Sequence, residues 1–266
     1  MEFAMKFRSI LSVFAVALCT LASYPAKAQD LLKQIESKKI IRIAVPTDYP
    51  PFGFAGSDMK PRGIDVEMAE LIAKKMNVKL ELVPVTGPNR VPYLQSGRAD
   101  LTISSLGKTP ERAKVIDYSI AYSPFYEAVY GKTDTKASNF EDLANRTIAV
   151  TRGSMQDIQL AQKAPKAVIK RFEDNNATLS AFLSGQTEMF ATGTAIAGAV
   201  MQKNPNVKME LKVILANAPC YVGIPKGNPE LVAKVNDIIR AAKKDGTLDA
   251  IIQKWLGTPA GDLPEN

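Results

Sequence analysis

Segments that favour strands and segments that favour helices alternate along most of this chain, and this alternation restricts the fold more than any other feature. Runs rich in β-branched residues predict strands at 39–45, 79–85, 99–105, 147–151, 167–172, 188–192 and 208–215. Apolar residues at helical spacing predict helices at 64–77, 90–97, 155–163, 176–185 and 194–202, and two more in 228–257 that break at Asp245-Gly246. Such alternation is typical of βαβ units, so we expect an α/β fold with mainly parallel sheets.

Two extended segments stand outside this alternation. Residues 125–132 and 220–227 are rich in aromatic and β-branched residues, and each ends in glycine and lysine. If both cross between two groups of elements, residues 133–219 form an inserted second lobe, and residues 29–124 and 228–266 form a discontinuous first lobe. Two such crossings would make a hinge about which the lobes can close on a ligand. The alternative is one larger sheet.

The first 28 residues have the pattern of a secretory signal peptide. Lys6 and Arg8 precede an apolar run from Ile10 to about Ala22, and residues 26–28 offer a small-x-small cleavage site. The run is too short for a confident transmembrane helix. We therefore expect export to the periplasm, with cleavage near Ala28.

The composition excludes several kinds of chemistry. The 266 residues include no histidine, which removes histidine-based catalytic triads, histidine metal sites and the commonest general base. Cleavage would remove Cys19 and leave Cys220 alone, so we expect neither a disulfide nor a zinc site. Glycine-rich phosphate-binding motifs are absent, and the net charge of +7 is spread along the chain without a basic run. We expect no cofactor, no metal and no nucleic-acid partner.

The segment SSLGKTPERAK, residues 104–114, places a positive charge at an unusual position. Thr109-Pro110 predicts a helix start, with a hydroxyl N-cap followed by proline. Arg112 would then lie in the first turn, where the helix dipole is already positive and a cation costs roughly 0.3–1 kcal/mol. A bound anion would remove this conflict. The alternative is a solvated surface arginine without a function.

Several motifs occur together and in the order found in one family. They are RIAVPTDYPPFGF (42–54), GIDVEMA (63–69), NRVPYLQSGRADL (89–101), TPERAKVIDYS (109–119) and DGTLDAIIQKWLG (245–257). Together they resemble the bacterial family 3 extracellular solute-binding proteins, the amino-acid-type receptors of ABC importers, over nearly the whole mature chain. The resemblance implies a periplasmic-binding-protein fold of type II, with two lobes joined by two hinge strands and the ligand held between them.

The resemblance also implies roles for individual residues. Arg112 occupies the position that pairs with the α-carboxylate of the ligand, and a guanidinium suits this role because it donates two parallel hydrogen bonds. Further contacts are expected from Ser104, Ser105, Gly107, Thr109 and, on the second lobe, Ser154. Tyr49 matches an aromatic residue that packs over the ligand, and Phe52 lies close by in the sequence. For both aromatic residues, the alternative to a ligand contact is a structural position in the core.

Two positions bear on the chemistry of the ligand. The NR pair at 89–90 resembles a branch that binds acidic amino acids, in which Arg90 would meet a side-chain carboxylate; the alternative is an exposed arginine. The family usually binds the α-ammonium with an aspartate, whereas Gly193 stands at that position here. Either another acid serves, with Asp48 the nearest by sequence, or the ligand has no ammonium and Thr192 and Thr194 offer hydroxyls instead.

The function that we expect is that of a monomeric receptor. It would bind a small carboxylate-bearing solute, an amino acid or derivative with acidic ones included, and deliver it to an ABC permease in the inner membrane. One alternative is a dehydratase acting on cyclohexadienyl carboxylates, as a few relatives of this fold are, with Glu173 or Glu188 as the general acid. Another is a sensor subunit that delivers its ligand to a chemoreceptor or kinase.

Overall fold

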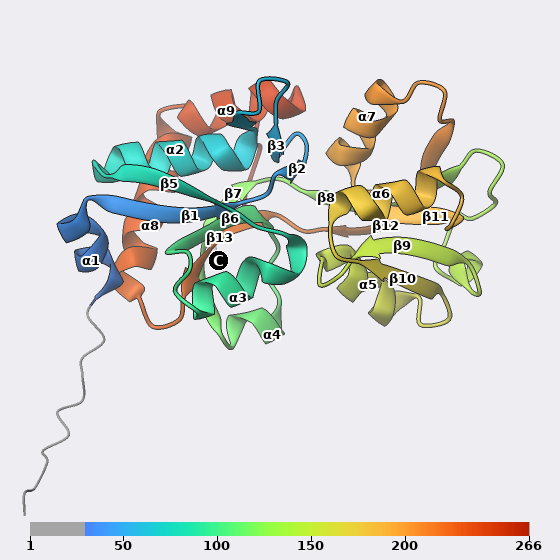
Figure 1. The fold of residues 1–266 in the computed structure, drawn as a ribbon, viewed down its shortest axis with the longest axis horizontal. Helices are drawn as coiled ribbons and strands as arrows, with labels where there is room; N and C mark the ends of the chain where they lie inside the picture. Colours follow the sequence, from blue (N-terminus) through green and yellow to red (C-terminus); the bar gives the residue numbers. More distant parts are fainter. Residues whose placement is uncertain (1–29, 266) are drawn as a thin grey trace, which may run out of the picture.

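The computed structural model describes residues 30–265, which form two lobes that lie side by side (Figure 1). The expected signal peptide, residues 1–28, lies outside the described residues. The two-lobed α/β fold predicted from the sequence is confirmed. Within the described part of the chain, two separate five-stranded sheets form in place of the single larger sheet that was the alternative.

The first lobe is built on a mixed sheet with the strand order β5-β1-β6-β13-β7. Its strands are β1 (Ile40–Val45), β5 (Lys79–Pro84), β6 (Leu101–Leu106), β7 (Ile116–Ser123) and β13 (Cys220–Pro225). β1 pairs in parallel with β5 and β6, whereas β13 runs antiparallel to β6 and β7. The helices are α1 (Leu31–Lys38), α2 (Ile64–Met76), α3 (Arg90–Gln95), α4 (Pro110–Ala113), α8 (Pro229–Lys244) and α9 (Thr247–Leu256). A small sheet of β2 (Asp48–Tyr49), β3 (Gly53–Ala55) and β4 (Pro61–Arg62) and the short helix η1 (Gly87–Asn89) complete this lobe.

The second lobe repeats this plan with the strand order β10-β9-β11-β8-β12. Its strands are β8 (Tyr126–Lys132), β9 (Thr147–Thr151), β10 (Val168–Phe172), β11 (Met189–Gly193) and β12 (Met209–Asn217). β9 pairs in parallel with β10 and β11, and β8 runs antiparallel to β11 and β12. Its helices are η2 (Glu141–Leu143), α5 (Met155–Lys163), α6 (Asn175–Leu183) and α7 (Thr194–Lys203).

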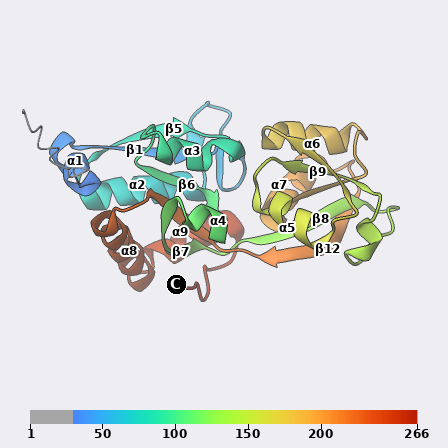
Figure 2. The same ribbon diagram turned by 90° about the horizontal axis from the view of Figure 1, so that it is seen from below.

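The chain passes between the lobes at two places. The segments that we expected to cross lie largely within the sheets, because β8 pairs with strands of the second lobe and β13 with strands of the first. The passages themselves are short: Pro124-Phe125 separates β7 from β8, and Ala218-Pro219 separates β12 from β13 (Figure 2). Extended backbone gains hydrogen bonds when it enters a ladder, which explains why so little of it remains between the sheets.

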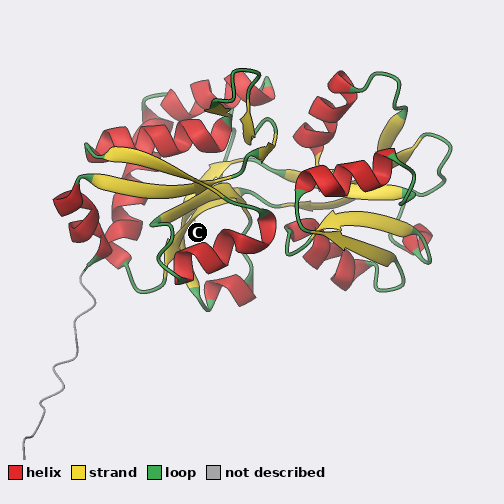
Figure 3. Ribbon diagram, viewed as in Figure 1, coloured by secondary structure: helices red, strands yellow, loops and turns green. Residues whose placement is uncertain are grey.

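Local signals explain where the helices begin and end. Thr109 caps α4 by accepting a hydrogen bond from the Arg112 backbone N at 3.1 Å, as the Thr109-Pro110 pair predicts. The expected break between the C-terminal helices is confirmed at Gly246, whose φ of 78° suits glycine. Helices cover the faces of both sheets (Figure 3). No helix within residues 30–265 is long and apolar enough to cross a membrane.

Candidate functional site

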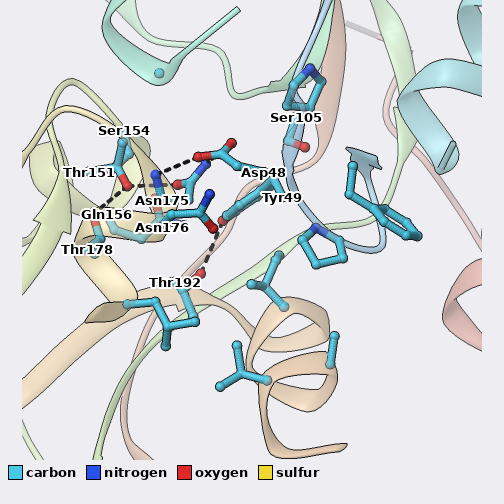
Figure 4. Close-up of a pocket in the computed structure, with 18 of the residues that line it drawn as sticks. Asp48, Tyr49, Ser105, Thr151, Ser154, Gln156, Asn175, Asn176, Thr178 and Thr192 are labelled. Carbon is cyan, nitrogen blue, oxygen red and sulfur yellow. Dashed lines mark hydrogen bonds between the residues drawn. The ribbon is translucent and has the colours of Figure 1, made fainter. Parts of the chain in front are cut away.

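A cavity of about 400 Å³ lies between the two lobes and is lined by both of them. Its polar lining from the first lobe includes Asp48, Tyr49, Arg90, Ser104 and Ser105. Its polar lining from the second lobe includes Glu127. It also includes Thr151, Ser154, Gln156, Asn175, Asn176, Thr178 and Thr192, which Figure 4 labels. Phe125, Phe190 and Ile196 add apolar surface. Concave sites of this size, with a few converging polar groups, commonly bind small molecules.

The residues that the sequence singled out divide into two sets. Those that line the cavity are Asp48, Tyr49, Arg90, Ser104, Ser105, Ser154 and Thr192. Those that lie outside its lining are Phe52, Gly107, Thr109, Arg112 and Thr194. A contact between any of them and a ligand stays a prediction.

Arg90 lies at the start of α3 with 8% of its surface exposed, so it is not the exposed arginine that was the alternative. Its Nε donates to the carbonyl oxygen of Gly87 at 3.0 Å, and its Nη1 donates to those of Ser104 and Ser105 at 3.1 and 3.4 Å. A longer bond of 3.5 Å joins its Nη2 to the carbonyl oxygen of Gly153 in the second lobe. Backbone carbonyls therefore hold this guanidinium at the cavity wall.

Arg112 bridges the two lobes. Its Nη1 donates to the carbonyl oxygen of Gly107 at 2.6 Å, and its Nη2 donates to that of Gly153 at 2.7 Å. Loss of hydration and the nearby charge of Arg90 lower the pKa of Arg112 to about 10. Within residues 30–265, neither arginine forms a salt bridge with a carboxylate. Two positive charges thus converge on one carbonyl oxygen, and an anion placed beside them would be stabilised.

Asp65 holds the end of β6 in the shape that presents Ser105 to the cavity. Ser105 has a φ of 45°, a left-handed conformation that is uncommon for residues other than glycine. Its backbone N and its Oγ donate to Asp65 Oδ2 at 2.9 and 3.1 Å, and Tyr122 Oη donates to Oδ1 at 2.6 Å. Burial raises the pKa of Asp65 to about 6, although these hydrogen bonds act to lower it.

The lobes approach each other closely where Gly107 faces Met155, the first residue of α5. A Cβ atom on Gly107 would lie 2.6 Å from Met155 Cγ, so the Met155 side chain would have to shift to admit a larger residue here. Ser154 caps α5 by accepting a hydrogen bond from the Asp157 backbone N at 3.1 Å, as the Gly-Ser helix start predicts. The start of α5 therefore lies at the cavity.

Further hydrogen bonds join the lobes elsewhere around the cavity (Figure 4). Asp48 accepts two of them from Asn175, from its backbone N at 2.8 Å and from its Nδ2 at 2.9 Å. Tyr49 Oη lies 3.3 Å from Thr192 Oγ1 and accepts a hydrogen bond from the Gly193 backbone N at 3.3 Å. Both oxygens of Asp48 thus already have partners, which weakens its case as the acid for a ligand ammonium.

Phe52 and Thr194 have structural positions beside the cavity. Phe52 is 1% exposed, and its ring centroid lies 5.1 Å from that of Phe125 and 6.3 Å from that of Tyr49. It therefore packs behind the aromatic residues that line the cavity and supports them. Thr194 is the first residue of α7, directly after Gly193.

Sequence reasoning missed most of the polar residues of the second lobe. Thr151 Oγ1 donates to Asn175 Oδ1 at 2.7 Å and lies 2.9 Å from Thr178 Oγ1. Gln156 is 4% exposed, and its side-chain amide forms no hydrogen bond within the described residues. Thr151 ends a parallel strand and Asn175 begins the helix after the next one, so the tendency of sites to gather beyond strand carboxyl ends could have found them.

Glu127 is the other acid besides Asp48 that lines the cavity. It lies on β8 with 1% of its surface exposed, and burial raises the pKa of its carboxyl to about 8. Its Oε2 has no hydrogen-bond partner within residues 30–265. The sequence placed Glu127 only within an expected crossing segment and assigned it no role.

The described residues offer little catalytic or metal-binding machinery. No group of three or more histidine, cysteine, aspartate or glutamate residues in this part of the chain could hold a metal ion. Glu173 and Glu188, the candidate acids of the dehydratase alternative, lie outside the cavity lining. Each is an exposed partner of an arginine, Glu173 of Arg152 and Glu188 of Arg146, both at 2.7 Å.

Comparisons with known proteins agree with this geometry. Residues 41–258 match the sequence profile of the bacterial extracellular solute-binding proteins, family 3. The ABC transporter glutamine-binding protein GlnH of Bacillus subtilis is 27% identical over 264 residues, which cover 96% of each chain.

Solved structures show the same architecture. The solute receptor for L-cysteine of Neisseria gonorrhoeae superposes with a TM-score of 0.80 at 32% identity, over 85% of this chain and 93% of the receptor. An ancestral amino acid-binding protein, described as a precursor of cyclohexadienyl dehydratase, has a TM-score of 0.77 at 32% identity, over 84% of this chain and 98% of its own.

Proposed function

The chain belongs to the bacterial extracellular solute-binding proteins, family 3, and from this membership we propose that it is the receptor of an ABC importer for a small carboxylate-bearing solute. The solute is an amino acid or a close derivative, acidic ones included, and it occupies the cavity between the lobes. Glutamine and L-cysteine are the ligands named for two of its relatives, which supports this class.

The observation that carries this proposal is the pair of guanidinium groups that converge on Gly153 and have no carboxylate partner among residues 30–265. A guanidinium has five N–H donors, so Arg90 and Arg112 keep donors beyond those that bond to backbone carbonyls. A ligand carboxylate placed there would accept charge-assisted hydrogen bonds, each worth on the order of 1.5–3 kcal/mol. Ser105 and Ser154, which line the cavity, would add hydroxyl or backbone contacts.

Binding proceeds with closure of the lobes. The carboxylate first meets the arginines of the first lobe while the cavity is open, and the second lobe then closes and expels water. The contacts of Asp48 with Asn175 and of Arg112 with Gly153 belong to the closed form, because each joins the two lobes. Two or three charge-assisted bonds with aromatic burial would suffice for micromolar affinity, about −8 kcal/mol.

The location and the partner follow from the same proposal. The signal peptide is removed near Ala28, and the mature chain acts as a monomer in the periplasm. A permease in the inner membrane accepts the solute from the closed receptor. The named relatives are binding proteins. The exposed positions of Glu173 and Glu188 give the dehydratase alternative no support.

Mass spectrometry of small molecules released from protein purified without denaturation tests this proposal. We expect a co-purified amino acid or related carboxylate. A thermal-shift panel of the twenty common L-amino acids and cystine supplies a second readout, in which a true ligand raises the unfolding temperature because it binds only the folded state. Failure of every panel member, together with a co-purified compound that lacks a carboxylate, would overturn the proposal.

A further inference from the structure

Position 193 is tightly packed, and it lacks the acid that binds an ammonium group in the family that this chain resembles. A Cβ atom on Gly193 would lie 2.5 Å from Phe125 Cζ and 2.6 Å from Ile196 Cδ1. Phe125 is 6% exposed and packs against Phe52, so it cannot move aside without opening the aromatic cluster. An aspartate at this position would therefore force Phe125 and Ile196 to shift.

The neighbouring strand provides a carboxyl at the same place. Gly193 of β11 and Glu127 of β8 are direct partners in the antiparallel ladder. Residues that oppose each other in this way project on the same face of the sheet, with Cβ atoms about 4.5–5.5 Å apart where both have one. Glu127 also lines the cavity, so its carboxyl lies one strand away from the expected acid.

Nothing in the described part of the chain satisfies this carboxyl. Glu127 is 1% exposed, and its Oε2 has no hydrogen-bond partner. The cations nearest to it electrostatically are Arg90, Arg112 and Lys163, and all three donate to backbone carbonyls, Lys163 to that of Leu215 at 2.6 Å. A buried polar atom without a partner is costly, so a donor from outside the chain would be strongly favoured.

We propose that Glu127 accepts the ammonium group of the ligand and thereby replaces the acid that is missing at position 193. The inference rests on the proposed function and narrows it: the ligand is a zwitterionic amino acid, with its carboxylate at the arginine pair and its ammonium at Glu127. Deaminated carboxylates and dicarboxylates without an ammonium are excluded as the main ligands.

Binding also moves a proton. Burial raises the pKa of Glu127 to about 8, so the carboxyl holds a proton at neutral pH when the cavity has no ammonium in it. An incoming ammonium favours the carboxylate, and the proton then leaves to the buffer. The groups that act on Glu127 electrostatically are Arg90, Arg112 and Lys163, and the neutral Tyr49 and Cys220 lie near it. Affinity for an amino acid should therefore rise with pH toward about 8.

The test compares amino acids with their deaminated counterparts. The probes are L-glutamine with glutaramate, L-cysteine with 3-mercaptopropionate, L-arginine with 5-guanidinovalerate and L-glutamate with glutarate, each titrated by calorimetry at pH 7. We expect at least one amino acid to bind and its counterpart to bind at least a hundredfold more weakly. In Glu127→Gln, which keeps the size of the side chain, that amino acid should lose at least thirtyfold in affinity while the counterpart changes little.

A second readout separates this role from a structural one. Calorimetry in phosphate and in Tris at pH 7 should show that the wild-type protein releases close to one proton per amino acid bound, and that Glu127→Gln releases almost none. Glu141→Gln, the same change at an exposed site of the second lobe, should behave as the wild type. Unchanged affinity in Glu127→Gln, or equal binding of both members of a pair, overturns the inference and leaves the proposed function standing. Binding of none of these probes and of no amino acid in the thermal-shift panel overturns the inference, and the proposed function falls with it only where the co-purified compound also lacks a carboxylate.

Discussion

The two lobes present different chemistry to the same cavity. The polar groups of the first lobe include an acid and an arginine that are already bonded: Asp48 to Asn175, and Arg90 to backbone carbonyls. The second lobe adds hydroxyl and amide groups, Lys203 and one acid. Among these, the side-chain amide of Gln156 and Oε2 of Glu127 form no hydrogen bond within the described residues. The difference indicates that the first lobe contributes the anion-binding charge and fixes the shape of the site, whereas the second lobe contributes an acid and an amide that a ligand would complete.

Two buried carboxyls show this contrast most clearly. Asp65 of the first lobe accepts hydrogen bonds from Ser105 and Tyr122, and its pKa rises only to about 6. Glu127 of the second lobe lacks such bonds within the described residues, and its pKa rises to about 8. Burial raises both pKa values, and hydrogen bonds to the charged form oppose that rise in Asp65 but not in Glu127.

Removal of the anion-binding charge of the first lobe is expected to have the largest effect on ligand affinity. Arg112→Met keeps most of the apolar length and deletes the guanidinium. We expect at least a hundredfold loss of affinity, about 3 kcal/mol, for whichever amino acid binds the wild type. Calorimetry measures it. Arg240→Met, an exposed arginine of α8 that pairs with Glu265, should bind normally. Equal affinity in both variants would show that the carboxylate lies elsewhere.

The pH dependence of the free energy of unfolding, measured without a ligand, tests the second lobe. The folded-state pKa of Glu127, about 8, lies above its usual value of 4.5, so the folded protein keeps a proton that the unfolded chain releases. The wild type should therefore lose stability as pH rises from about 4.5 to 8, by on the order of 5 kcal/mol from this group. Glu127→Gln cannot titrate and should lack this part of the slope. Urea unfolding at several pH values measures both proteins, and parallel slopes would refute the assignment.

Replacement of Asp65 by a neutral residue tests how much this carboxyl of the first lobe stabilises the fold. In Asp65→Asn, one acceptor oxygen faces the donors of Ser105 and Tyr122, and the new amide adds donors among them. We expect a loss of about 2 kcal/mol in the free energy of unfolding at pH 7. Asp237→Asn, at an exposed site of α8, serves as the matched control. A midpoint in urea equal to that of the control would mean that Asp65 does not hold the end of β6.

The smallest expected effect concerns the bonds that join the lobes. Asn175→Ala removes the side-chain donor to Asp48, while the backbone donor remains. We expect a loss of about 1 kcal/mol in the closed form and therefore about fivefold weaker binding of every ligand. Calorimetry with two different amino acids should show the same factor for both, whereas Asn206→Ala, an exposed change, should show none. A different factor for each ligand would place Asn175 in direct contact with it.

Most of the fold could be predicted because its signals are local. The β-branched run at 147–151 is the strand β9, and α2 buries Ile64, Met68 and Leu71 as its helical spacing predicts. Thr109 marks the start of α4 through its capping side chain, and Gly246 marks the start of α9 through the backbone freedom of glycine. The small sheet of β2, β3 and β4 was missed, because strands of two or three residues carry no periodicity.

The site was harder to predict, because its chemistry depends on residues far apart in the sequence. Tyr49, Ser105 and Ser154 were found because their motifs resemble those of the family, and all three line the cavity. Glu127 has no local signal of its role, because its meaning comes from pairing with Gly193 in another strand. The bonds of Arg112 to Gly107 and Gly153 likewise depend on how the lobes meet.

The contact of Gly107 with Met155 offers a way to set the working range of this receptor. A larger residue at position 107 would act as a wedge between the lobes, since its Cβ would meet Met155 Cγ at 2.6 Å. Gly107 lies outside the cavity lining and Met155 belongs to it, so such a wedge would oppose closure for every solute and would also move one lining side chain. A series of larger residues there would turn one receptor into a set of sensors with graded working ranges.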